Sequence, residues 1–313
     1  LKDPSSLAIF GVRGANGVII ITTKKAKEGQ TLVNINTSFG FKKVVDKVDL
    51  VNGPQFQELY SEQLANQKDT PFDFSGWNAN TNWQDEIFQT AFITNNNISI
   101  TGASPKHSFY LGVGYSHEQG NIKHEKFSKV TINASNDYKI TDFLKVGFQF
   151  NGARMLPADS KQVLNALRAT PIAPVYNDEY GLYSALPEFQ KAQINNPMVD
   201  VSLRANTTKA ENYRASGNIY GEVDFLKHFN FKAMFSMDYA SNNGRTYQPI
   251  VKVYDPTVSG NIATLGTGKT EVSQFKENET KVQSDYVLTY TNSFDNGNHN
   301  LTATAGFTTY YNS

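Results

Sequence analysis

The sequence contains no cysteine in 313 residues. Disulfide bonds and thiolate metal sites are therefore excluded. The absence is compatible with an oxidising compartment whose proteins do without disulfides, and it does not by itself identify one.

Long hydrophobic runs and an excess of one charge are also missing. The longest apolar run is Val18 to Ile21, far below the ~18–20 residues that a transmembrane helix requires, so a helical membrane protein is excluded. The 29 basic side chains equal the 29 acidic ones in number. This balance gives no electrostatic reason to expect a nucleic-acid partner, which calls for a clustered basic face.

Aromatic residues and a two-residue alternation are what the sequence has in quantity. It contains 21 Phe and 16 Tyr, although its mean hydropathy is only −0.46. From residue 31 onward, apolar and polar residues alternate with the period of a β-strand. The alternation predicts about nine strands, at 31–41, 94–103, 107–116, 129–140, 144–152, 211–226, 229–243, 282–294 and 299–311.

The polar faces of these strands decide the fold class. A soluble sandwich carries Lys and Glu on its outer faces, whereas here the polar positions are mostly Gly, Ser, Thr, Asn and Gln. Small polar residues on one face and aromatic or branched ones on the other are typical of a barrel with a wet lumen and a lipid-facing exterior. We therefore predict an all-β fold, a partial antiparallel transmembrane β-barrel. Because soluble sheets also alternate, a soluble β-protein is the alternative.

The lengths of the connections support the barrel. Tight turns are expected near 103–106, 139–143, 226–229 and 295–300, long loops at 42–93, 157–210 and 248–280, and a modest one near 118–126. Outer-membrane barrels have short periplasmic turns and long external loops. Aromatic residues flank the short turns, as in an interfacial girdle. Helical spacing predicts short helices within 52–67 and 159–171, inside two of the long loops.

Nine strands do not close a bacterial single-chain barrel, which has an even number of strands. An open edge in lipid would leave backbone groups unpaired at several kcal/mol each. The chain starts at Leu1 without the pattern of a secretion signal, and residues 307–313 fall inside a strand-like pattern. We therefore expect the chain to be a piece of a larger protein.

Two glycine-containing stretches imitate nucleotide sites. Gly11, Gly14 and Gly17 precede the apolar strand 18–23, whereas a dinucleotide-binding loop places its strand before the glycines. Gly268-Lys269-Thr270 imitates the end of a P-loop, but Ala263 stands where its first glycine should be. A structural corner and a loop tip are the simpler interpretations.

Metal and catalytic sites find little support. His117 and His124 flank a hairpin tip, where two imidazoles could hold a metal, but the Gly and Asn between them are the ordinary composition of an exposed turn. We assign no metal. No nucleophile–base constellation is visible, and a carboxylate pair for glycoside hydrolysis would converge only in three dimensions. We expect neither an enzyme nor a cofactor.

Aromatic residues in the loops are the candidate substrate contacts. Tyr176, Tyr180 and Tyr183 stand among Asn, Asp and Gln in 171–197, and aromatic faces beside amides and carboxylates are typical of sites that hold sugar rings or peptides. Trp77 and Trp83 of the first long loop complete the set. The alternative is that these rings pack the loops against themselves or against a partner.

The first 25 residues combine Leu1-Lys2-Asp3, a small-residue helix expected at 5–10, and a motif that is followed by Thr22-Thr23-Lys24. The motif residues are Gly11, Arg13, Gly14, Asn16 and Gly17. In this combination, residues 1–25 resemble the closing segment of the plug domain in the SusC/RagA family of TonB-dependent outer-membrane transporters of Bacteroidota. Residues 80–104, 109–120, 127–147 and 165–178 also resemble early barrel segments of this family.

The resemblance implies a 22-stranded barrel occluded by an N-terminal plug. Residues 1–25 would end the plug, 26–30 would be a linker, and 31–313 would be the N-terminal part of the barrel. In this reading the long external loops are 42–93, 157–210 and 248–280.

The implied activity is import of glycan fragments or oligopeptides across the bacterial outer membrane. The implied partners are a SusD-like surface lipoprotein, outer-membrane lipid, and TonB–ExbB–ExbD acting through N-terminal parts that this chain does not include; no nucleic acid is expected. A passive or structural barrel, such as a porin or an adhesin, is the second hypothesis, and a soluble carbohydrate-active enzyme is the third.

Overall fold

The computed structural model describes residues 28–157, 163–266, 268–294 and 298–313, apart from the side chains of 203–206. The expected end of the plug, residues 1–25, and the first two residues of the expected linker lie outside this part of the chain. The same holds for all five residues of the plug motif, Gly11, Arg13, Gly14, Asn16 and Gly17.

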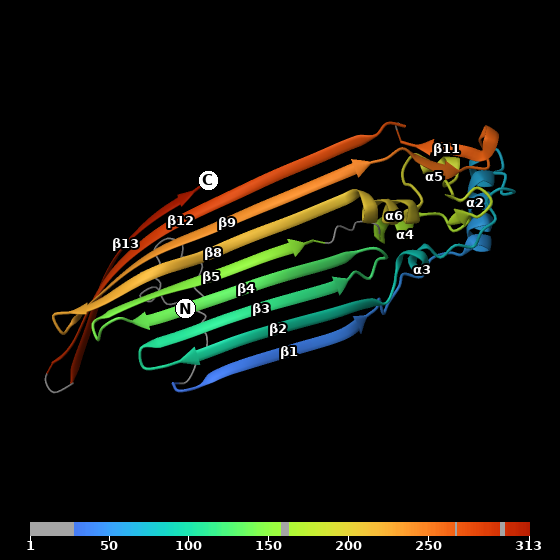
Figure 1. The fold of residues 1–313 in the computed structure, drawn as a ribbon. Helices are drawn as coiled ribbons and strands as arrows, with labels where there is room; N and C mark the ends of the chain where they lie inside the picture. Colours follow the sequence, from blue (N-terminus) through green and yellow to red (C-terminus); the bar gives the residue numbers. More distant parts are fainter. Residues whose placement is uncertain (1–27, 158–162, 267, 295–297) are drawn as a thin grey trace.

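Nine long strands form one antiparallel sheet, in which each strand pairs with the long strands before and after it in the sequence (Figure 1). The strands are β1 (Thr31–Lys42), β2 (Ala91–Ala103), β3 (His107–Gln119), β4 (Lys126–Lys139), β5 (Leu144–Leu156), β8 (Thr208–Phe225), β9 (Phe229–Gln248), β12 (Glu271–Phe294) and β13 (His299–Asn312). Two small hairpins pair β6 (Tyr176–Asn177) with β7 (Leu182–Tyr183), and β10 (Val251–Tyr254) with β11 (Ile262–Leu265). The predicted antiparallel all-β fold of about nine strands is confirmed.

Short turns and long connections lie at opposite ends of the sheet. The helices and the β10–β11 hairpin gather beyond one end, where the long connections emerge (Figure 1). One predicted boundary is wrong: the expected loop 248–280 ends earlier, because β12 begins at Glu271, which pairs with Gln248 of β9. The sequence hid this extension because polar residues occupy most positions on both of its faces.

Helices occur only within the long connections of the described chain. The predicted first helix is α2 (Gly53–Gln67): the Asn52 side chain accepts a hydrogen bond from Gln55 N, and the Gln55 side chain accepts one from Asn52 N, both at 3.0 Å. This capping box satisfies two backbone donors at the helix start. The second predicted helix is α4 (Val163–Arg168), whose expected caps at 159 and 160 lie outside the described residues.

Three α-helices of the described chain were not predicted. They are α3 (Trp83–Ile87), α5 (Glu188–Lys191) and α6 (Pro197–Thr207). The first two are single turns, too short for a helical period to show. In α6 the alternating Val199, Val201 and Leu203 have the period of a strand, so local pattern and tertiary structure disagree there.

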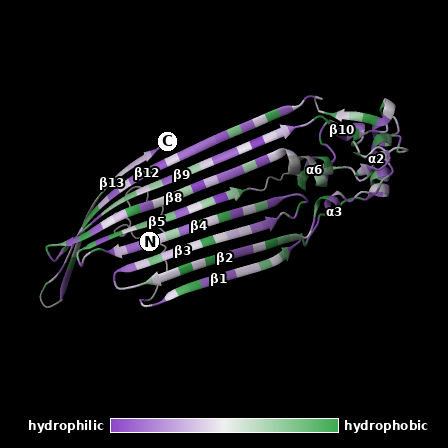
Figure 2. Ribbon diagram, viewed as in Figure 1, coloured by the Kyte–Doolittle hydropathy of each residue, from purple (hydrophilic) through white to green (hydrophobic). Residues whose placement is uncertain are grey.

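The register places apolar and polar residues in separate rows across all nine strands. One row of laterally paired residues contains only apolar residues and glycine: Val33, Ile100, Leu111, Ala134, Phe150, Gly217, Met237, Val282 and Tyr311. The neighbouring row contains only polar residues and glycine: Asn34, Ser99, Gly112, Asn133, Asn151, Ser216, Asp238, Lys281 and Asn312. Figure 2 shows the same alternation as hydrophobic and hydrophilic bands along the strands. Because successive side chains point to opposite faces, the sheet has an apolar outer face and a polar inner face.

The outer face is not covered by any described part of the chain. Val33, Ile35, Phe39 and Phe41 of β1 are 62–75% exposed, and Ile219 of β8 is 62% exposed. The apolar outward positions of β9 run from Phe229 to Tyr239. At ~3.3 Å per residue and a tilt of ~40°, these ten steps rise about 25 Å, the height of the apolar band of an outer-membrane barrel. This length fits a lipid-facing wall.

We expect a charge on the outer face to be far more costly than the same charge one residue away. Phe148→Arg, near the middle of the band, should destabilise the full-length protein in bilayers by about 2–4 kcal/mol, whereas Gln149→Arg on the inner face should have little effect. Unfolding by urea, followed from liposomes, measures both. Equal destabilisation by the two substitutions would contradict the assignment of the faces.

Candidate functional site

The long connections pack into one body, which we call the loop cap, made of the described residues of 43–90, 120–125, 163–207 and 249–270. It holds every residue of the buried apolar cluster of the described chain, from Trp77 and Trp83 to Val253. Hydrogen bonds join its segments: Trp83 Nε1 donates to the Thr170 carbonyl at 2.8 Å, and Ala185 N donates to the Tyr254 carbonyl at 2.7 Å. The cap is therefore a packed platform and not a set of independent loops.

Polar side chains also hold the cap together. The buried Gln84 amide accepts from Val48 N at 3.0 Å and donates to Val48 O at 2.7 Å, as a paired strand residue would. The Lys191 ammonium contacts Glu188 and lies 3.5 Å from Asp255, whose side chain is 2% exposed. The hydrogen bond to Glu188, aided by the charge of Asp255, raises the pKa of Lys191 above its ordinary value. The ion pair between Lys191 and Asp255 thus connects α5 to the residue that follows β10.

The three candidate tyrosines lie together in the cap. Tyr176 and Tyr183 face each other across the β6–β7 hairpin with ring centroids 5.3 Å apart, and Tyr180 packs against Tyr254 at 5.1 Å. The Asn261 side chain donates to the Tyr180 hydroxyl at 3.0 Å. Tyr176 is 45% exposed, so its ring is open to a ligand.

The two candidate tryptophans are placed differently. Trp77 and Trp83 are each 2% exposed and belong to the core of the cap. Their faces are covered by protein, so in this structure they serve packing and present no ring to a ligand. The alternative interpretation, loops packing against themselves, describes these two residues.

A polar hollow of about 550 Å³ opens in the cap between 47–52, 80–85 and 167–171. Its polar lining includes Lys47, Asn80, Asn82, Asp85 and Arg168. Lys47 and Asp85 are paired with each other. Such a set of amides and charges suits a hydroxyl- or amide-bearing ligand. Sequence reasoning missed it, although the run of Asn at 78–82 was a visible signal.

The inner face of the sheet carries a second polar hollow, of about 680 Å³. At its centre the Tyr220 hydroxyl donates to Asp137. The ammonium groups of Lys145 and Lys232 lie 5.4 and 4.6 Å from the Tyr220 ring centroid, within reach of cation–π attraction. Further polar side chains of the lining are those of Asn133, Ser135 and Gln149, and Phe109 and Tyr110 add two aromatic rings. The wall thus offers hydrogen-bonding and charged groups to a hydrated solute.

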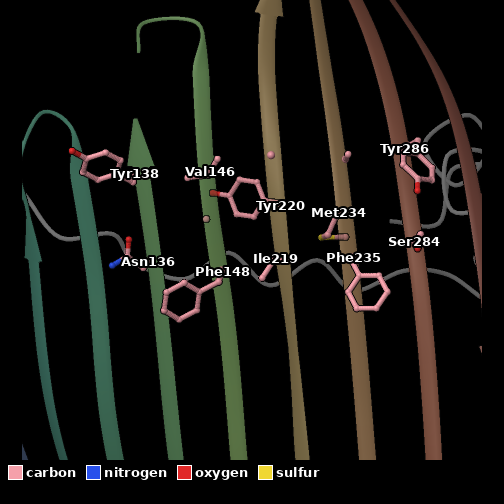
Figure 3. Close-up of a pocket in the computed structure, with 13 residues that line it drawn as sticks. Asn136, Tyr138, Val146, Phe148, Ile219, Tyr220, Met234, Phe235, Ser284 and Tyr286 are labelled. Carbon is pink, nitrogen blue, oxygen red and sulfur yellow. The ribbon is translucent and has the colours of Figure 1, made fainter. Parts of the chain in front are cut away.

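A third hollow, of about 560 Å³, lies on the outer face and is lined mainly by Tyr138, Val146, Phe148, Phe235 and Tyr286 (Figure 3). It exists because Gly221 and Ala233 leave space in that row: a Cβ added at Gly221 would meet nothing within 4 Å. Its lining is mostly apolar, with Asn136 and Ser284 as the polar exceptions, and belongs to the face that no described residue covers. We therefore do not assign a polar substrate to it.

The two histidines of the hairpin tip lie in different surroundings. His117 Nδ1 lies 2.9 Å from the Ser128 hydroxyl, and His124 is exposed. In the described ranges, no group of three or more His, Cys, Asp or Glu side chains is arranged to hold a metal. None of the described helices is long and apolar enough to cross a membrane.

Comparison with known proteins identifies the family. No family model matches the chain. The TonB-dependent receptor P3 of Formosa agariphila is 31% identical over 98% of this chain, and the TonB-dependent receptor SusC of Bacteroides thetaiotaomicron is 36% identical over 57% of it. The chain belongs to the SusC/RagA family of TonB-dependent receptors.

The SusC/RagA chain spans only part of these relatives, 30% of receptor P3 and 18% of SusC. Among solved structures, the RagAB peptide transporter superposes on this chain with a TM-score of 0.77 at 19% sequence identity. The superposition covers 98% of this chain and 38% of the matched chain of the transporter. The structure of the RagAB peptide importer in its open-open state superposes with a TM-score of 0.75. At this identity the likeness is one of fold, and it fits a nine-stranded section of a barrel.

We expect the cap to depend on the buried indole. Trp83→Ala in the full-length receptor removes a core side chain and its hydrogen bond to Thr170, and should destabilise the cap by about 3–5 kcal/mol. Limited proteolysis should then cleave within 163–207 much faster than in the unmodified protein. Tyr176→Ala, at an exposed position, is the control and should leave cleavage unchanged; equal rates for all three proteins would contradict a packed cap.

Proposed function

We propose that the chain is the first part of the barrel of a TonB-dependent importer, which takes up glycan fragments or oligopeptides across the bacterial outer membrane. In this proposal the outer face of the sheet contacts lipid, the inner face lines the transport path, and the loop cap lies at the cell surface. A SusD-like lipoprotein would cover the cap. We propose no enzymatic reaction.

The observation that carries the proposal is the separation of the two rows across nine strands. An apolar face of this extent exceeds the few hundred Å² that soluble monomers leave exposed. A neighbouring row without apolar side chains is what a water-filled interior requires. The kinship with TonB-dependent receptors adds the energy source, which the wall itself does not reveal.

The entry of the chain into the sheet supports the expected orientation. Gly29 N donates to the Ala103 carbonyl at 2.9 Å, and Glu28 bridges the same residue. Ala103 ends β2 at the first tight turn, so residues 28–30 approach the sheet at its short-turn end. With short turns on the periplasmic side, β1 runs outward and a plug preceding it would lie on that side.

Within the cap, we propose Tyr176, Tyr180 and Tyr183 as substrate contacts, together with the polar hollow that Arg168 lines. Trp77 and Trp83 would hold these groups in place from beneath. The packed core supports this division, because it lets exposed rings keep a fixed position without a ligand.

Energy coupling separates this proposal from a passive barrel. In cells that produce the full-length receptor, a protonophore should abolish uptake of labelled oligosaccharide or oligopeptide, because TonB draws on the proton gradient. A general porin in the same cells is the control and should keep conducting. Uptake that persists without the gradient would favour the passive barrel.

The tyrosines can be tested in the same assay. Tyr176→Ala with Tyr180→Ala removes two rings, each worth about 0.5–1.5 kcal/mol in an aromatic contact, and should weaken apparent affinity roughly fivefold to hundredfold. The matched Tyr176→Phe with Tyr180→Phe keeps the rings and should retain most of the affinity. Unchanged affinity in the double alanine variant would remove both residues from the site.

A further inference from the structure

Basic residues gather on the outer face between its apolar band and the loop cap. The outward positions of β4, β5, β8, β9 and β12 in this zone carry five cations, which we call the basic belt: Lys126, Arg154, Lys209, Arg245 and Lys276. Each has the strand parity of the apolar outer residues. Glu211 is the one acidic residue at outward positions of these described strands.

The register fixes the height of the belt. Each residue rises about 2.5 Å along the barrel normal at a tilt of ~40°, and Tyr239 marks the upper edge of the apolar band. Arg154 pairs laterally with Tyr213, which pairs with Ser241; Lys276 pairs with Asn243; Lys209 pairs with Arg245. Counted along the strands, these cations therefore lie two, four and six residues beyond the row of Tyr239, and Arg245, on the same strand as Tyr239, lies about 15 Å above the band.

Most of the belt is free to bind an anion. Glu211 accepts from Arg154 at 2.8 Å and from the Tyr213 hydroxyl at 2.6 Å. In the part of the chain that the structure describes, Lys126, Arg245 and Lys276 have no ion-pair partner, and all three are exposed. The excess positive charge therefore faces outward unneutralised.

The inner face at the same height carries charges of both signs, and its acidic residues gather on β12. The inward positions of β12 carry Glu271, Glu277 and Glu279, on the strand whose outward position carries Lys276. On β12 the acidic residues of this zone therefore point inward and Lys276 points outward, while Lys129 of β4 and Arg214 of β8 lie on the inner face. The outer face thus keeps a net positive belt, and a positive belt beside an apolar surface complements an amphiphile with an anionic headgroup.

We propose that the basic belt binds the phosphate groups of an anionic glycolipid in the outer leaflet, whose acyl chains lie on the apolar band below. The inference rests on the membrane placement in the proposed function. A phospholipid headgroup layer is only ~5–7 Å thick, and would leave Lys209 and Arg245 above it. A phosphorylated sugar headgroup reaches the whole belt, and Arg can contact phosphate through two N–H groups.

The test uses the full-length receptor in zwitterionic detergent and measures its affinity for diphosphoryl lipid A. Lys209→Gln with Arg245→Gln and Lys276→Gln should weaken binding roughly a hundredfold, at about fivefold per charge. Lys145→Gln with Lys232→Gln and Lys281→Gln removes the same charge from the inner face and should leave affinity within about threefold. Lys276→Arg keeps the charge and should bind normally.

Equal affinity of the outer-face variant and the unmodified receptor would overturn the proposal, as would an equal loss in the inner-face variant. Phosphatidylglycerol binding as tightly as lipid A would overturn the requirement for a large headgroup. The measurement needs neither TonB nor an import substrate, so a receptor that imports nothing can still bind lipid A. Loss of the lipid site alone would leave the import proposal standing.

Discussion

The uninterrupted antiparallel register is the constraint on which the rest of the structure depends. Residue pairing continues without a bulge along each pair of neighbours, as in the twenty pairs from Glu271↔Gln248 to Tyr290↔Phe229. A slip of one residue would move an entire strand's apolar set to the other face. The backbone hydrogen bonds therefore do more than hold strands together, because they keep every outward position outward over nine strands. Both the lipid-facing wall and the basic belt follow from that continuity.

The nine-stranded sheet and the loop cap differ in where their apolar side chains lie. No described part of the chain covers the apolar face of the sheet, which is exposed along its length, and such a face suits the lipid that we propose around it. The loop cap is built as a soluble domain is, with Trp83, Ile172 and Leu186 buried and with buried polar groups such as Gln84 hydrogen-bonded. On β9 the outward residues beyond Tyr239 are Ser241, Asn243, Arg245 and Tyr247, so the continuous apolar band ends before the cap begins at residue 249. Each part is thus suited to the medium proposed for it.

Local pattern predicted the sheet well because the apolar and polar residues alternate within each strand, as its outer and inner faces do. Val33 is apolar and Asn34 is polar, as are the rows of the sheet to which they belong. This difference can be read from neighbouring residues without long-range information. The capping box at Asn52 and Gln55 was equally local. Prediction failed where the pattern changes meaning: residues 271–280 are strand but no longer contact an apolar medium, and Val199 and Val201 alternate as a strand does while lying in a helix that packs into the cap.

The sequence by itself determined the β-class, the approximate strands, the tight turns and the kinship with TonB-dependent receptors, because these depend on period, turn composition and motif. Only the tertiary structure decided which aromatic residues are available. Tyr176 is open while Trp77 and Trp83 are buried, since exposure depends on segments distant in sequence that meet in the cap. The same reason applies to the basic belt: its five cations stand on five strands far apart in the chain, and only the lateral register brings them into one zone of the outer face above the apolar band.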